Sequence, residues 1–72
     1  MSYEQALNIA VANNDLLSEA TIRVKLADVY VILEDFSQAR QLLLDARQVY
    51  TQLGDQLEVS LLDRRIRALS FL

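Results

Sequence analysis

Apolar residues recur at steps of three and four along most of the chain, which is the period of an α-helix with one buried face. One such row runs through the middle of the sequence: Leu16, Ala20, Val24, Ala27 and Val31. A second apolar row lies beside it: Leu26, Val29, Tyr30 and Leu33. A helix that is apolar over more than half of its circumference must pack on two sides. The pattern therefore predicts a central helix with a neighbour on each side.

Three aspartates, Asp15, Asp35 and Asp55, divide the chain at an even spacing of 20 residues. Each follows a helical pattern and suits the N-cap position, where a carboxylate accepts the free N–H groups of a first turn. Glu58 stands three residues after Asp55, in the capping-box relation. Gly54, directly before Asp55, suits the left-handed end of a helix.

The other two predicted helices begin with similar caps. Gln38 has the capping-box relation to Asp35, although Ser37 is an alternative cap, and Ser2 with Gln5 repeats the arrangement. This punctuation predicts four helices, over residues 3–13, 16–33, 37–53 and 56–71. Short joints favour antiparallel neighbours. We expect one all-α domain, residues 1–72, of antiparallel helix hairpins.

The order of residue types repeats after 40 positions. The shift superposes Ala6 on Ala46, Ile9 on Val49, Asn14 on Gly54, Asp15 on Asp55 and Leu26 on Ile66. A period of this length is typical of arrays in which each helix pair buries its apolar face against the next.

Six residues stand at the offsets of the tetratricopeptide repeat: Ala27, Tyr30, Phe36, Ala39, Leu43 and Ala46. The chain thus resembles that family, in a long-helix variant with a repeat near 40 residues. The resemblance covers about residues 20–53 and implies a short α-solenoid of stacked hairpins. It makes the three alanines small inter-helix contacts, with Tyr30 and Phe36 packed between the helices. Arg23 and Glu34 depart from the family, which usually has Trp and Gly there.

The resemblance implies a non-catalytic protein–protein interaction scaffold whose groove is lined by helices 16–33 and 56–71. The candidate groove residues are Lys25, Asp28, Ile32, Arg64 and Arg65. Five of the seven basic residues lie on these two helices, which favours an acidic and apolar peptide as partner. The alternative interpretation is that these are ordinary solvated charges. Asp28 stands where the chaperone-tail clamp of some family members needs Asn, so that ligand is not expected.

Composition argues against other function classes. The sequence has no His and no Cys, the side chains that most often serve as metal ligands and nucleophiles. Glu34 and Asp35 form an adjacent carboxylate pair, but at a solvated turn, where capping is the expected role. We therefore expect no enzyme, no metal and no cofactor.

The net charge of -3 speaks against binding to nucleic acid, and no apolar run approaches a membrane span of ~18 residues. These absences favour a cytoplasmic location.

The C-terminal residues Leu69, Phe71 and Leu72 are apolar, and the last helix lacks an evident polar capping face. Arrays of this kind usually need about three repeats to be stable, whereas this chain has roughly two. We expect these residues to contact another copy, another subunit or further repeats of a longer array. The alternative function is therefore a structural homo-oligomerisation unit.

Overall fold

The fold is seen in a computed structural model that describes residues 2–72. It contains α1 (Tyr3–Ala12), α2 (Leu16–Ile32), α3 (Phe36–Leu53) and α4 (Gln56–Leu69), and no strand in the described residues. The protein is therefore all-α with four helices, as predicted. The ends differ slightly: α3 begins one residue earlier than expected, and α4 ends at Leu69, where the chain makes a final turn.

Each helix begins with a side-chain cap. The carboxylates of Asp15, Asp35 and Asp55 each accept the N–H of the residue three positions on, at 3.2–3.3 Å. Asp35, and not the alternative Ser37, therefore caps α3. Only Ser2 and Gln5 complete the reciprocal capping box, since the Gln5 side chain accepts the Ser2 N–H at 3.0 Å. These bonds satisfy N–H groups that a helix start leaves free.

The three inter-helix turns share one geometry. The residue before each capping aspartate is left-handed, with φ of 55° at Asn14, 60° at Glu34 and 76° at Gly54. Each following aspartate donates its backbone N–H to the carbonyl five residues earlier, at 2.9, 2.9 and 3.0 Å. The chain thus reverses direction in the same way every 20 residues, although only one of the three turns has the glycine that suits this conformation.

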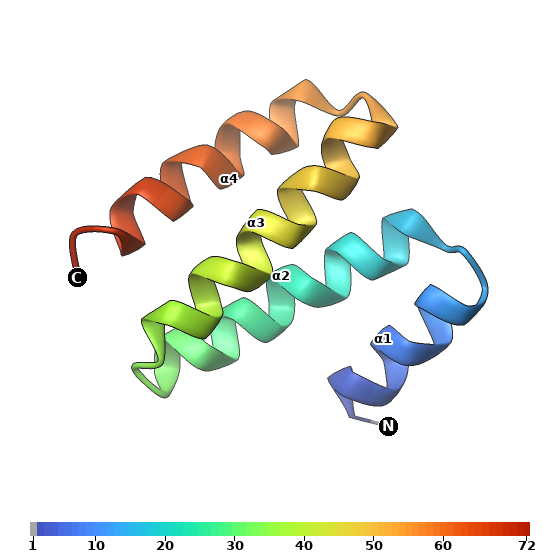
Figure 1. Cartoon of the computed structure of the whole chain (residues 1–72), viewed down its shortest axis with the longest axis horizontal. Coiled ribbons are helices and arrows are strands. Elements are labelled where there is room, and N and C mark those ends of the chain that lie inside the picture. The colour runs from blue at the N-terminus through green and yellow to red at the C-terminus, as the bar shows by residue number, and fades with distance from the viewer. Residues whose placement is uncertain (1) are drawn as a thin grey trace.

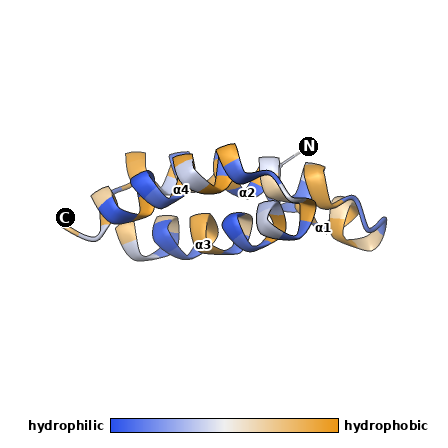
Figure 2. Cartoon of the chain, turned by 90° about the horizontal axis from the view of Figure 1, so that it is seen from above, coloured by the Kyte–Doolittle hydropathy of each residue, from blue (hydrophilic) through white to orange (hydrophobic). Residues whose placement is uncertain are grey.

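The helices follow one another as a flat meander (Figure 1). Within residues 2–72, α1 contacts α2, α2 contacts α3, and α3 contacts α4, while no other helix pair approaches at the backbone. The Cα atoms span 35 × 28 × 12 Å. Figure 2 shows α2 and α4 on one side of the slab, with α3 on the other. This arrangement places the face formed by α2 and α4 opposite the face formed by α3.

The core is centred on α3. Ten buried residues form one cluster: Ala20, Ala27, Ala39, Leu43, Ala46, Val49, Tyr50, Val59, Leu62 and Leu69. Alanines fill the contact between α2 and α3, and larger residues of α3 and α4 surround them. Tyr30 and Phe36 pack against the cluster from its edge. Small side chains allow the two central helices to approach closely.

Candidate interaction surfaces

A small hollow lies between α2 and α4. It has a volume of about 190 Å³ and is lined by Val31, Arg65, Ala68, Leu69 and Leu72. Four of these five residues are apolar, and Arg65 supplies one guanidinium group. Small-molecule pockets usually measure ~300–1,000 Å³, so this hollow fits a single side chain better than a metabolite.

Arg65 forms an ion pair with Asp28 that joins α4 to α2. The structure therefore brings two of the predicted groove residues into direct contact. Both side chains are more than one-third exposed, and exposed pairs of this kind stabilise a fold by only ~0.2–1 kcal/mol. The pair instead positions Arg65 beside the hollow, where an incoming carboxylate would have to share the guanidinium with Asp28.

The other three predicted groove residues, Lys25, Ile32 and Arg64, are exposed to solvent. None of them lines the hollow, and Ile32 is 81% exposed at the end of α2. Among the described residues, neither Lys25 nor Arg64 has a carboxylate partner within 4.0 Å. They add positive charge to α2 and α4 without forming an ion pair in the described part of the chain.

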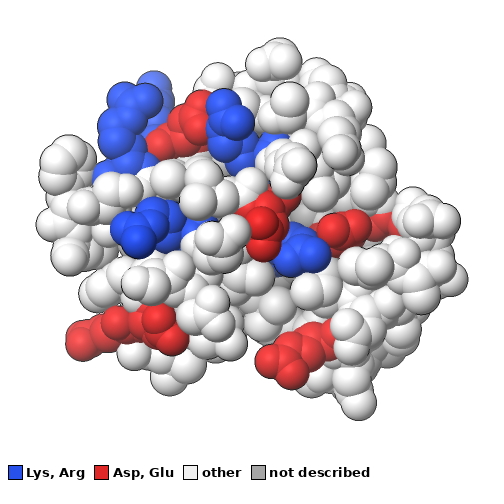
Figure 3. Space-filling model, viewed as in Figure 1, with Lys and Arg blue, Asp and Glu red and all other residues white. Residues whose placement is uncertain are grey.

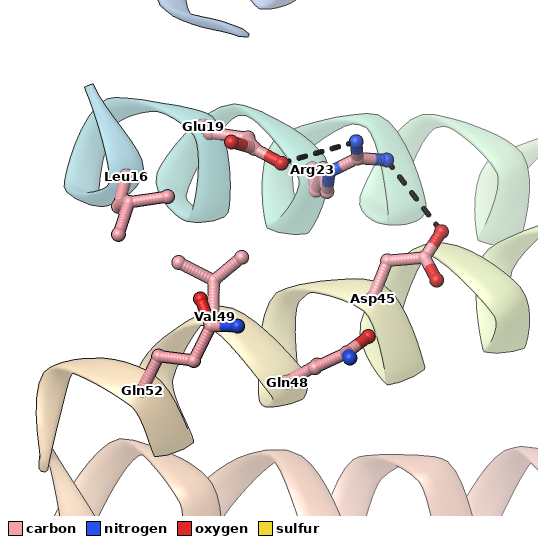
Figure 4. Close-up of a pocket in the computed structure, with 7 residues that line it drawn as sticks. All are labelled: Leu16, Glu19, Arg23, Asp45, Gln48, Val49 and Gln52. Atoms are coloured by element: carbon pink, nitrogen blue, oxygen red, sulfur yellow. Dashed lines mark hydrogen bonds and ion pairs between the residues drawn. The ribbon is translucent and has the colours of Figure 1, made fainter. Parts of the chain in front are cut away.

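A larger hollow lies between α2 and α3 (Figure 4), with a volume of about 350 Å³. The Arg23 guanidinium crosses it, contacting Glu19 at 3.2 Å and Asp45 at 3.5 Å. Its Nε atom is buried and has no hydrogen-bond partner within residues 2–72. Arg23 thus forms ion pairs with carboxylates of both helices. The sequence carried one signal for these pairs, the four-residue step from Glu19 to Arg23.

One further ion pair joins two helices. Arg47 of α3 binds Asp63 of α4 through two guanidinium nitrogens. On the face seen in Figure 3, basic groups gather at the upper left, and acidic groups lie among them and below them.

The carboxylate pair at the second turn has a structural role. Glu34 occupies the left-handed position and Asp35 caps α3. In the part of the chain that the structure describes, no group of three or more metal-ligating side chains comes together, and no helix is long and apolar enough to cross a bilayer.

A third hollow, of about 210 Å³, lies between α1 and α2. Its lining is Ala6, Ile9, Ala10, Asn13, Asp15, Ser18 and Ile22. At its rim, the Ser18 hydroxyl donates to Asp15 at 2.7 Å, and the Ser18 N–H donates to the same carboxylate at 3.2 Å. These bonds, the hydroxyl first, hold the pKa of Asp15 below its ordinary value of 3.8. The sequence did not predict α1 as a contact surface, because α1 has the shortest helical pattern.

The C-terminal prediction needs two corrections. Leu69 is buried in the core, so it is not an exposed contact, whereas Phe71 and Leu72 are 85% and 74% exposed. In addition, α4 does carry a polar outer face, formed by Ser60, Arg64 and Arg67, all of which are exposed. Sequence periodicity alone did not distinguish the buried side of α4 from its exposed side. The last residues of the chain lie outside the helix, and the arginines of α4 lie next to its leucines.

Comparison of the chain with protein-family models, curated proteins and solved structures finds no match.

Proposed function

We propose that the chain is a non-catalytic protein-interaction scaffold, built as an array of tetratricopeptide type, that binds an acidic and apolar peptide between α2 and α4. The observation that carries the proposal is the hollow lined by Val31, Ala68 and Leu72 with Arg65 at its side. An apolar side chain of the peptide enters the hollow, and a neighbouring carboxylate reaches Arg65. One anchor in a pocket with charges around it is a common design of peptide sites.

Positive charge on the same two helices supports this choice of partner. Lys25 and Arg64 are exposed and without carboxylate partners among the described residues. Charges of this kind speed the encounter with an acidic peptide and discriminate against a basic one. Their contribution is screened at high salt, so binding should weaken as ionic strength rises.

The test is a selection from a displayed library of short random peptides against the immobilised chain. Enriched peptides should combine Asp or Glu with Leu, Ile or Phe, and their binding should weaken in the double variant Lys25→Glu with Arg64→Glu. The matched control is Arg40→Glu, which reverses a charge on α3, away from the hollow. Unchanged peptide binding in the double variant would show that the basic residues of α2 and α4 do not form the site.

A second candidate function, homo-oligomerisation, is favoured by the exposure of Phe71 at one end of the chain and of Ile9 at the other. The two functions use different anchor side chains, since neither Phe71 nor Ile9 lines the hollow between α2 and α4.

A further inference from the structure

The two ends of the chain have opposite charge. Residues 2–22 contain three acidic residues, Glu4, Asp15 and Glu19, and no Lys or Arg, and Glu19 is paired with Arg23 just beyond them. Residues 64–72 contain three arginines, Arg64, Arg65 and Arg67, and no Asp or Glu. Arg65 is paired with Asp28, but Arg64 and Arg67 have no carboxylate partner within 4.0 Å in residues 2–72.

The 40-residue shift makes α1 the equivalent of α3, and the two helices differ in what covers them. Leu43 and Val49 of α3 are 0% and 7% exposed, whereas the equivalent Tyr3 and Ile9 of α1 are 44% and 50% exposed. The reason is the neighbourhood: α3 lies between α2 and α4, while α1 contacts α2 alone. Thus α1 has the side-chain pattern of an internal helix but lacks a helix on its other side.

The same shift makes α4 the equivalent of α2. The face of α2 that packs on the α3-centred core is Ala20, Val24, Ala27 and Val31, and the equivalent face of α4 is Ser60, Arg64, Arg67 and Phe71. This face of α4 has no helix on it in the described chain. Arginine side chains keep their charge in water while their apolar stems cover a neighbouring surface, so the face suits a contact that forms and dissociates.

We infer that copies of the chain associate head to tail, with α1 of one copy seated on the arginine face of α4 of another. The contact follows the order of α2 on α3, with Arg64 and Arg67 at the positions of Val24 and Ala27. Since Ala27 is fully buried, the longer arginines set the two helices further apart than α2 and α3. Across from these arginines comes Tyr3, whose ring face attracts a guanidinium group. Ala6 provides the small contact that Ala46 provides inside the chain. This assembly is a specific form of the homo-oligomerisation function, and Arg64 is the one residue that it shares with the proposed peptide site.

Charge selects this arrangement over a symmetric dimer. Pairing two α1 faces about a two-fold axis would bring the acidic ends of both chains together, and like charges at an interface are unfavourable. Head-to-tail contact instead joins an acidic end to a basic one. Because each copy keeps one free face of each kind, the contact generates open chains or rings of copies, and salt should weaken it.

The test is sedimentation velocity over a range of concentrations, with two variants that each remove one side of the contact. Ile9→Asp alters the α1 side, and Arg67→Glu with Phe71→Ser alters the α4 side; all three side chains are exposed, so helicity should be unchanged. The wild type should exceed twice the chain mass of 8.2 kDa at high concentration, and each variant alone should remain at 8.2 kDa. An equimolar mixture of the two variants should form a dimer, because one intact face of each kind remains. Leu33→Asp is the matched control, since it places the same charge on an exposed residue at the far end of α2.

Three outcomes would overturn the inference: a wild type that stays monomeric at all concentrations, an α4-side variant that assembles like the wild type, or a mixture that stays monomeric. The second outcome would indicate two-fold pairing through α1. Peptide binding by the monomeric Ile9→Asp variant separates this test from that of the peptide site. Retained binding without assembly supports only the scaffold, and assembly without peptide binding supports only self-association.

Discussion

Helices α1 and α3 occupy the same place in the 40-residue repeat but have different roles in the fold. Five residues of α3 are buried, whereas only Ala10 is buried in α1. Their patterns are similar, since Ala6 and Ile9 match Ala46 and Val49 in type and position. The comparison shows that the apolar pattern of a helix indicates which face can be buried. The number of neighbouring helices decides whether that face is buried.

The largest effect should come from removing a core side chain at this position of the repeat. Leu43 is fully buried, so Leu43→Ala should lower the free energy of unfolding by ~2–5 kcal/mol through lost burial and a cavity. At the equivalent position of α1, Tyr3→Ala should change it by less than about 0.5 kcal/mol, as exposed substitutions usually do. Urea denaturation of the two variants measures both. Equal losses would mean that α1 is packed as tightly as α3.

Overpacking should give a smaller difference between the two helices, again with the larger loss of stability in α3. Ala46 and Ala39 are completely buried at the contact of α3 with its neighbours, and Ala46→Leu or Ala39→Leu should cost ~1–3 kcal/mol of unfolding free energy. Ala6→Leu, at the α1 equivalent of Ala46, should cost less, because the hollow beside Ala6 accommodates added methyl groups. Thermal unfolding at low protein concentration, where copies of the chain do not associate, measures the stability of each variant. A severe loss on Ala6→Leu would contradict the open α1 face.

The turns allow a similar comparison at the backbone. At Gly54 an added Cβ meets nothing within 4 Å, so Gly54→Ala tests only the left-handed φ and should destabilise by ~1 kcal/mol. Glu34 has the same conformation without a glycine, so Glu34→Gly should stabilise by up to about 1 kcal/mol. The midpoint of urea unfolding should fall for Gly54→Ala and rise for Glu34→Gly. A stabilising Gly54→Ala would show that the turn does not keep its left-handed conformation.

The smallest effect concerns the cap of α2 and its dependence on pH. The pKa of Asp15 is lowered by the Ser18 hydroxyl and N–H, so its contribution to stability is present above the ordinary pKa of 3.8. The contribution is lost as pH falls through the lower pKa of the folded chain. Ser18→Ala removes the hydroxyl bond and should raise this pKa toward its ordinary value. NMR titration of the Asp15 carboxyl measures the change, and an identical titration curve in Ser18→Ala would contradict it.

Local chemistry predicted much of this fold. Asp15, Asp35 and Asp55 mark helix starts because a capping carboxylate acts on N–H groups only three residues away. The six residues from Ala27 to Ala46 that carry the family resemblance all lie in or against the core. Two features were missed because they depend on partners distant in sequence: Arg23 bridges to Asp45, and Arg65 binds Asp28. Residue spacing along one helix contains no information about such pairs.

Helix number, helix starts and the position of each reversal follow from interactions within a few residues, so they are encoded along the chain. Which apolar faces become core depends on the order in which helices meet, and only the packed arrangement settles that. It buries Leu69 while exposing Phe71, and it leaves α1 open while α3, with an equivalent pattern, is covered on both sides. Burial depends on which elements lie next to a helix in space. A helix that lacks one of its two neighbours therefore keeps its apolar pattern, but its apolar side chains stay in contact with water.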